Sequence, residues 1–226
     1  MANYFIDPEI LLPYLPPATE LDLYKGKCYV SLIGFMFEKT KVLGVKIPFH
    51  INFEEVNLRF YVRHFDNGEW KRGAVFIKEI VPKIAISLVA NTLYNEKYST
   101  MQMQHYFKSS NEQIELGYSW LHQKKWNKLE ASVENKTIEM KAESEEEFLA
   151  EHYWGYSKFN EKTTIEYAVR HPRWKLFPIK KFSIDVDFIK IYGDKFSFLQ
   201  NATPESVFVA QGSAIQILNK RIIKVD

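Results

Sequence analysis

The chain has 226 residues, of which 46% are hydrophobic and 26% charged, a balance typical of a globular protein with a substantial core. Its net charge of +2 excludes a strong basic field, and no run of lysine and arginine forms a stripe for nucleic acid. The single cysteine excludes an internal disulfide, and no apolar run is long enough to span a membrane. These features predict a cytoplasmic protein without nucleic-acid or membrane partners.

Short strands dominate the first part of the chain. Residues 1–23 include Pro16 and Pro17, and they predict an extended arm packed on the body rather than an element of its own. Strands with alternating or continuous apolar residues are predicted at 29–37, 42–47, 53–63 and 73–81. Gly34 inside the first of them indicates a bend or a close backbone approach. The turn signal at residues 66–68 joins the last two strands as a hairpin.

Two helices interrupt the later strands. Residues 84–94 are apolar on almost every side, which predicts a buried helix. Ser144 and Glu147 form a capping box that begins a helix at 145 and carries it to about 153. Further strands are predicted at 101–107, 113–120, 128–133, 163–169, 182–191, 206–210 and 214–217.

No repeat, linker or change of composition divides the chain, so residues 1–226 are expected to form one domain. Many short strands with two helices between them predict a mainly β fold, an antiparallel barrel or cone whose openings the helices cover.

The polar face of the strand at 53–63 is the first candidate site. Glu55, Asn57, Arg59 and Arg63 lie at odd positions, opposite an apolar even face. A carboxylate, an amide and two guanidiniums on one face can line a pocket for an anionic or carbonyl-bearing ligand. The alternative is a solvated strand face with charge pairs between neighbouring strands.

Two further groups of residues are candidates. Lys83 follows a strand end and precedes an apolar helix, an environment in which a lysine can act as a Schiff-base nucleophile, although most lysines at such positions are solvated. His152, Tyr153 and Trp154 belong to an aromatic block that can form the mouth of a ligand pocket. The same block can also serve as a lid that packs on the barrel end.

Motifs for the common cofactors and metals are absent from the sequence. It contains no glycine-rich nucleotide loop, no HxxxH pair, no Cys/His cluster and no GxSxG elbow. We therefore expect no cofactor and no bound metal, and a small molecule as the partner.

Six blocks resemble the YqjF-like family of uncharacterised conserved bacterial proteins. They are VSLIGF at 30–35, LGVKIPFH at 43–50, FEEVNLRFYVR at 53–63, VFIKEIVPK at 75–83, FLAEHYWGY at 148–156 and HPRW at 171–174. The resemblance covers nearly the whole chain and implies no activity, because that family has none assigned.

A more distant similarity is to the acetoacetate decarboxylase-like fold, an antiparallel cone-shaped barrel around a ligand cavity. The resemblance implies that Glu55 corresponds to a buried glutamate of the catalytic site and Lys83 to the Schiff-base lysine. It also implies that Glu55, Asn57 and Arg59 face the cavity. Ile84 stands where the decarboxylase has a second lysine, whose charge lowers the pKa of the first, so the resemblance supports the fold and not the decarboxylation.

Three functions follow as hypotheses. The first is binding or transformation of a small carboxylate or carbonyl compound, with Arg59 or Arg63 pairing with the anion and Glu55 as acid or base. The second is a Schiff-base enzyme that uses Lys83. The third is a non-catalytic structural or interaction protein.

Overall fold

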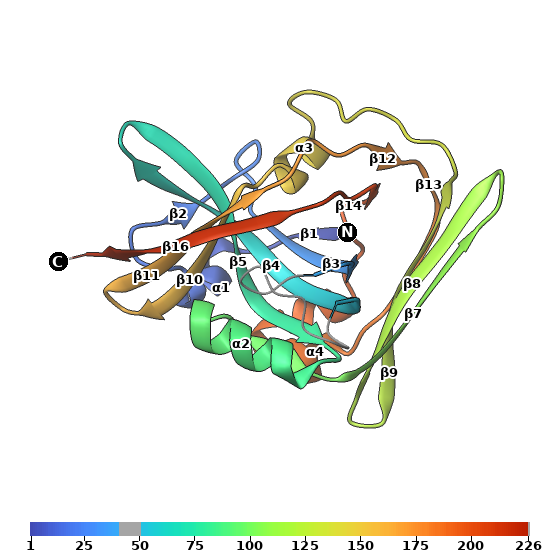
Figure 1. Cartoon of the computed structure of the whole chain (residues 1–226), viewed down its shortest axis with the longest axis horizontal. Coiled ribbons are helices and arrows are strands. Elements are labelled where there is room, and N and C mark those ends of the chain that lie inside the picture. Colours follow the sequence, from blue (N-terminus) through green and yellow to red (C-terminus); the bar gives the residue numbers. More distant parts are fainter. Residues whose placement is uncertain (41–50, 226) are drawn as a thin grey trace.

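The computed structural model describes residues 1–40 and 51–225. Strands predominate in these residues and form three sheets, with four short α-helices and two 3₁₀ helices beside them (Figure 1). None of the described helices is long and apolar enough to cross a membrane. The strand expected at 42–47 and the block at 43–50 lie outside the described residues.

The large sheet carries the strand predicted at 53–63. Its hydrogen-bonded order is β14 (Ser206–Val207), β1 (Ala2–Phe5), β3 (Tyr29–Phe37), β4 (Phe53–Asp66), β5 (Glu69–Val81), β10 (Trp154–Asn160), β11 (Thr163–Arg170) and β16 (Gln216–Lys224). Two shorter strands join it, β2 (Glu20–Leu21) beside β4 and β6 (Tyr98–Thr100) beside β5. Most pairs are antiparallel, and β5 is parallel to β10 and β6.

The order runs from one edge strand to another without closing. Among the described strands, β14 and β16 end the order and do not pair with each other. The mainly β class is confirmed, whereas the closed barrel is not, because the large sheet is open.

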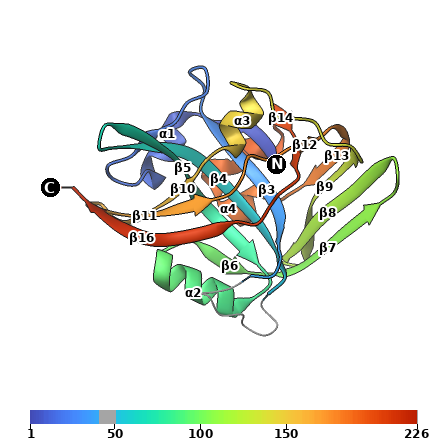
Figure 2. The same ribbon diagram turned by 45° about the horizontal axis from the view of Figure 1, so that its top comes forward.

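The remaining elements form two small sheets and the helices. A four-stranded sheet contains β13 (Ile179–Asp185), β9 (Lys125–Glu134), β8 (Gln113–His122) and β7 (Gln102–Ser109), and β12 (Leu176–Phe177) pairs with β15 (Val209–Ala210). The helices are α1 (Pro8–Leu11), η1 (Leu12–Tyr14), α2 (Ile84–Tyr94), α3 (Glu145–Ala150), α4 (Phe188–Tyr192) and η2 (Asp194–Gln200). In both ribbon views the four-stranded sheet lies to one side of the large sheet, α2 runs along the bottom, and α3 lies near the top (Figures 1 and 2).

The hairpin of β4 and β5 is the longest pairing in the fold. Asn67 and Gly68 connect the two strands with φ of 51° and 87°. Positive φ at both central residues is the geometry of a type I′ turn, whose twist matches that of paired strands. The predicted hairpin is confirmed, and both of its strands extend to this turn.

β4 is buried on both faces, not on one as the alternation predicts. Its even face, including Leu58 and Phe60, is fully buried in the main core. Its odd face is also buried at Glu55 and Asn57, and again at Tyr61, which packs against Phe148 of α3. Elements distant in sequence cover this polar face, so alternation alone does not reveal its burial.

Gly34 of β3 brings the four-stranded sheet onto the large one. A Cβ at this position would come within 2.6 Å of the ring of Tyr118 on β8. Only glycine allows so close an approach of the two sheets, and the prediction for Gly34 is confirmed.

Residues 1–23 contain regular elements, contrary to the predicted arm. β1 pairs with β3 in the large sheet, and α1 follows Asp7, whose side chain accepts a hydrogen bond from the backbone N–H of Glu9 at 3.0 Å. Pro8 occupies the first helical position, where its missing N–H costs nothing. Elements of four residues are too short to display a periodicity in sequence.

Two helix predictions and one strand prediction need correction. α2 has the predicted bounds but is not buried, because it rests on the sheet through Ile86 and leaves Ile84 75% and Leu88 68% exposed. α3 ends at Ala150, since the residues that follow pair with β5 and β11 as β10. The strand predicted at 182–191 ends at Asp185, because the side chain of Asp187 caps α4.

Candidate functional site

The polar face of β4 begins in the interior and ends at the surface. Glu55 and Asn57 are each 1% exposed, and Asn57 Nδ2 donates a hydrogen bond to Glu55 Oε1 at 2.8 Å. Arg59 lies under α3 and donates from Nη2 to the carbonyl oxygen of Leu149 at 3.1 Å. Arg63 pairs at the surface with Glu20 at 2.5 Å. The structure thus brings Glu55, Asn57 and Arg59 onto one covered face and leaves Arg63 outside it.

Two more buried carboxyl groups lie beside Glu55. Glu79 of β5 stands directly opposite Asn57 and is 2% exposed. Glu96 precedes β6 and accepts a hydrogen bond from Tyr167 Oη of β11 at 2.7 Å. Tyr98 of β6 donates to Glu55 Oε2 at 2.8 Å. We call Glu55, Glu79 and Glu96, with the two tyrosines, the acid cluster.

The chain between α2 and β6 is shaped to place this cluster. Asn95 ends α2 in the left-handed conformation, with φ of 54°, and its Nδ2 donates to the carbonyl oxygen of Lys158. Asn91 then holds the backbone of Tyr98 on both sides, accepting from its N–H at 2.8 Å and donating to its carbonyl oxygen at 3.0 Å. These contacts fix Glu96 and Tyr98 against β5.

Burial makes all three carboxyl groups hold their protons more tightly than usual. It raises the pKa of Glu55 to about 7, although hydrogen bonds from Asn57 and Tyr98 oppose the rise. It raises the pKa of Glu96 to about 8, against the hydrogen bond from Tyr167. For Glu79, burial comes first and the charges of the other two carboxylates add to it, so its pKa lies well above the usual range. At neutral pH the cluster therefore keeps some of its protons.

Several atoms of this face have no hydrogen-bond partner among the described residues. They are Asn57 Oδ1, Arg59 Nε and Glu79 Oε2. A buried polar atom without a partner costs about 1–3 kcal/mol, so each one calls for an explanation, such as a bound ligand, water or ion. Two acceptors and one donor without partners thus lie on the neighbouring strands β4 and β5.

His152 lies behind α3 in a separate polar group. Its ring packs on Tyr61 at 4.6 Å between centroids, and Nε2 lies 3.4 Å from Arg72 Nη2 and 3.6 Å from Asp22 Oδ2. Burial lowers the pKa of His152 to about 4, against the attraction of Asp22, so the ring is neutral at pH 7. Burial alone would raise the pKa of Asp22, but hydrogen bonds from His152 and Arg72 hold it below its usual value.

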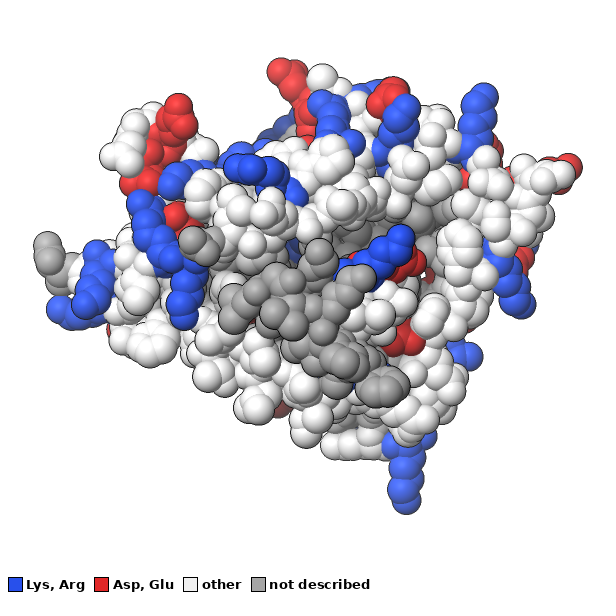
Figure 3. All heavy atoms as spheres, in the orientation of Figure 1, with Lys and Arg blue, Asp and Glu red and all other residues white. Residues whose placement is uncertain are grey.

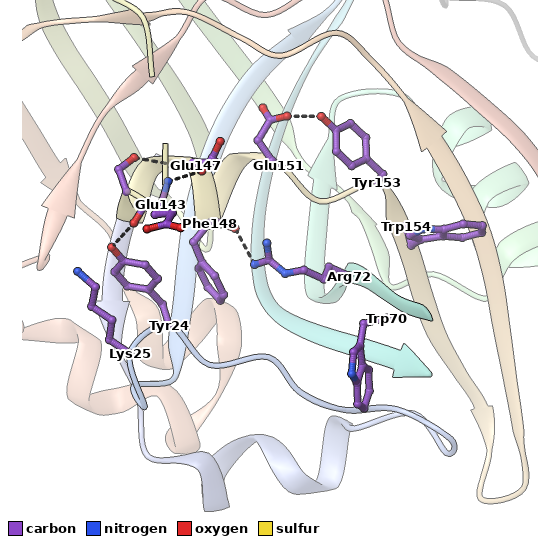
Figure 4. Close-up of a pocket in the computed structure, with 11 residues that line it drawn as sticks. Tyr24, Lys25, Trp70, Arg72, Glu143, Glu147, Phe148, Glu151, Tyr153 and Trp154 are labelled. Atoms are coloured by element: carbon purple, nitrogen blue, oxygen red, sulfur yellow. Dashed lines mark hydrogen bonds between the residues drawn. The ribbon is translucent and has the colours of Figure 1, made fainter. Parts of the chain in front are cut away.

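An open groove of about 700 Å³ lies outside α3 (Figure 4). Tyr153 and Trp154 line it, so these two predicted ligand residues do not join Glu55 and Asn57. Two of its charged groups are bonded within the protein: Arg72 Nε donates to Asp22 Oδ2 at 2.6 Å, and Glu151 accepts from Tyr153 Oη. Lys25 and Glu143 line the groove as well.

Lys83 is half-buried at the N-cap of α2, two residues beyond the end of β5. The register that pairs Asn57 with Glu79 would, if continued, set Lys83 opposite Phe53 on the face of Glu55. The ladder ends before that point, at Val56 and Ile80.

Four residues of the site, Glu79, Glu96, Tyr98 and Tyr167, were not predicted from the sequence. One signal was present for Glu79, which lies between Ile77 and Val81 at alternate positions that are otherwise apolar. No local pattern marks Glu96 or Tyr167, which meet only through the fold.

A family model for an uncharacterized conserved protein, DUF2071, matches residues 1–214. The chain belongs to the DUF2071 family. No curated protein sequence matches it.

Solved structures with similar folds are acetoacetate decarboxylase-like. The chain resembles such an enzyme from Sphingomonas wittichii RW1 with a TM-score of 0.57 and 12% identity, covering 99% of this chain and 87% of that one. It resembles the enduracididine biosynthesis enzyme MppR with a TM-score of 0.63 and 11% identity, covering 99% and 84%. For acetoacetate decarboxylase from Legionella pneumophila the values are 0.56 and 11%, covering 99% and 80%. The expected likeness of fold is confirmed.

The outer surface of the molecule carries charges of both signs. Figure 3 shows lysine and arginine side chains spread over one side of the molecule among acidic ones, without a single continuous basic stripe. The concentration of polar groups that is unusual for this chain is therefore internal.

Proposed function

We propose that the protein binds a small carboxylate or carbonyl compound beside Glu55, Asn57 and Arg59. The observation that carries this proposal is the buried Nε of Arg59, a donor with no partner among the described residues, on the same strand face as Glu55. A guanidinium N–H of this kind donates strongly to a carboxylate or carbonyl oxygen. Arg59 Nη2 is held by Leu149, which keeps the guanidinium oriented for the ligand.

Glu55 can exchange a proton with such a ligand. Its pKa of about 7 lets it serve as either acid or base at neutral pH. Its two oxygens are held by Asn57 and Tyr98, so the carboxyl group has a defined orientation. The proposal therefore includes chemical transformation of the bound compound, with Glu55 as the proton carrier.

The comparisons support this class of ligand. Structures of MppR are described with bound pyruvate and with the condensation product of pyruvate and imidazole 4-carboxaldehyde. Pyruvate carries both a carboxylate and a carbonyl. At 11–12% identity the likeness concerns the fold, and the ligand class rests on the residues of this chain.

Binding is tested by thermal unfolding with pyruvate, acetoacetate and butanoate at pH 7. A ligand at 100 times its Kd stabilises the folded state by about 2.7 kcal/mol. We expect at least one of these acids to raise the Tm of the wild type. Arg59→Gln should abolish this rise, and Arg63→Gln, the matched control on the same strand, should retain it. Absence of any rise in the wild type, or equal loss in both variants, would contradict the proposal.

A second candidate is Schiff-base chemistry through Lys83, which the strand register and the decarboxylase-like fold favour. The Lys83 amine would add to a ligand carbonyl carbon and release its oxygen as water, leaving a C=N bond. Incubation with pyruvate and borohydride would reduce that bond to a stable secondary amine. Peptide mapping should then find the adduct on Lys83, and Lys83→Arg should lose it. An adduct that is absent or spread over surface lysines rules this candidate out.

A further inference from the structure

The acid cluster collects three buried carboxyl groups that form no ion pair with a cation of the described chain. Its three carboxyl groups come from β4, from β5 and from the segment before β6, and each is at least nine-tenths buried. No ion pair joins any of them to a lysine or arginine among the described residues. The amine of Lys97, the residue after Glu96, lies over the ring of Tyr14 at 4.9 Å from its centroid.

The hydrogen bonds within the cluster use only part of its acceptor capacity. Tyr98 and Asn57 each donate a hydrogen bond to one oxygen of Glu55, and Tyr167 donates to one oxygen of Glu96. Asn57 Oδ1 and Glu79 Oε2 accept nothing from the described residues, and their residues face each other across β4 and β5. A proton on Glu79 would let this side chain donate to Asn57, and an entering group that donates two hydrogen bonds would satisfy both acceptors once that proton has left.

An organic cation fits this requirement. Ammonium and guanidinium groups are pure donors, and they add the positive charge that buried carboxylates need. No group of three His, Cys, Asp or Glu side chains within residues 1–40 and 51–225 is placed to hold a metal ion.

We propose that Glu55, Glu79, Glu96 and Asn57 bind the cationic nitrogen group, ammonium or guanidinium, of a small organic ligand. This inference rests on the proposed function in one respect: Arg59 would take the carboxylate of the same molecule. Arg59 lies two residues along β4 from Asn57, a distance of about 7 Å. The ligand class is therefore an amino or guanidino acid with a short spacer between its charged ends.

Binding of the cation should release protons. The groups that face the cluster from every packed element are Glu55 and Arg59 of β4, Glu79 of β5, Glu96 and Lys97 before β6, Tyr98 of β6 and Tyr167 of β11. Burial keeps the carboxyl groups partly protonated at pH 7, and a bound cation favours their ionised form. The cation thus replaces protons that the empty cluster holds.

Three matched probes test the inference by titration calorimetry at pH 7: 4-guanidinobutanoate with both charged groups, butanoate with the anion only, and butylguanidine with the cation only. We expect 4-guanidinobutanoate to bind the wild type about tenfold or more tightly than butanoate. Repetition in buffers of different ionisation enthalpy should show net proton release with the two guanidino compounds and none with butanoate.

Glu79→Gln keeps the shape of the side chain and removes its charge. In this variant the affinity for 4-guanidinobutanoate should exceed that for butanoate by about threefold or less. The affinity for butanoate should be the same as in the wild type. Glu112→Gln, an exposed carboxylate on a turn, should leave all three affinities unchanged. If Glu79→Gln does not fold, the wild-type affinities and proton counts decide the matter.

The outcomes separate this inference from the proposed function. Binding of butanoate with no gain from the guanidinium would overturn the cation site and leave the proposed function standing. If butylguanidine binds and neither carboxylic acid does, the result would support the cation site and overturn the proposed function. Failure of all three probes to bind would overturn both.

Discussion

Replacing Glu55 by glutamine should flatten the dependence of stability on pH. The wild-type carboxyl has a pKa of about 7 in the folded protein, against an ordinary value of 4.5. Because the folded value is the higher one, the folded state binds more protons than the unfolded state between these limits. The contribution of Glu55 to the free energy of unfolding should therefore fall as pH rises from about 4.5 to about 7, and then level off.

The interval between the two pKa values sets the size of this effect. The difference between the two pKa values corresponds to about 3 kcal/mol. This is the free energy of unfolding that the protein loses when Glu55 ionises. Glutamine cannot ionise, so the variant lacks this loss. Glutamine also presents an NH₂ group to either Asn57 or Tyr98, both of which donate to Glu55, and this costs about 1 kcal/mol at every pH. The change in slope, not the stability at one pH, isolates the buried charge.

Urea unfolding at several values between pH 5 and pH 8 measures the effect. Relative to the wild type, Glu55→Gln should gain about 2.5 kcal/mol across this range, being about equally stable at pH 5 and more stable at pH 8. The remaining slope of the variant belongs to the other shifted groups: Glu79 and Glu96 act in the same direction as Glu55, and His152 and the Met1 amine act in the opposite one. Glu112→Gln, which removes an exposed carboxylate, should follow the wild-type curve. Parallel curves for Glu55→Gln and the wild type would refute the reasoning, because they would mean that Glu55 ionises equally in both states.

Three further substitutions test the packing around the site. Phe60→Ala should lower the free energy of unfolding, measured in urea, by about 3–5 kcal/mol. Phe65 lies on the same strand and is 55% exposed, so Phe65→Ala should lower it by less than about 1 kcal/mol. Similar losses in the two variants would contradict the burial of the even face. Ser144→Ala should cost about 1 kcal/mol in thermal unfolding, since Ser144 Oγ accepts a hydrogen bond from the backbone N–H of Glu147 in the first turn of α3. An unchanged Tm would show that this cap contributes nothing. Gly155→Ala should destabilise by about 1–3 kcal/mol in urea, because its Cβ would lie 2.2 Å from the ring of Tyr167; an unchanged midpoint would show that the ring moves aside freely.

Local patterns predicted the strands around the site but not what covers them. The alternation at 53–63 correctly separates the apolar face of β4 from the polar one, and the turn signal correctly joins β4 to β5. The alternation of apolar and polar residues along a strand does not indicate whether another element packs on its polar face. The polar face is buried because α3 and β6 pack on it, through contacts between residues that are 90 and 43 positions apart in sequence.

The outcome for α2 has a related cause. Its composition indicates which side chains would gain from burial, and this favours a buried helix. The surface available to cover them depends on where the helix docks. α2 packs against β5 and β6 mainly through Ile86 and Ser87, which leaves Ile84 and Leu88 in contact with solvent.

The sequence by itself determined the mainly β class, the β4–β5 hairpin, the bounds of α2 and the side of β4 on which Glu55, Asn57 and Arg59 lie. These properties depend on neighbours within a few residues, where chain geometry dictates which side chains share a face. Only the tertiary structure decided that Glu79 and Glu96 meet Glu55, and that Arg63 remains at the surface. Burial and electrostatic coupling depend on distances through space. The fold brings together residues that are far apart in the sequence, and only then do these effects arise.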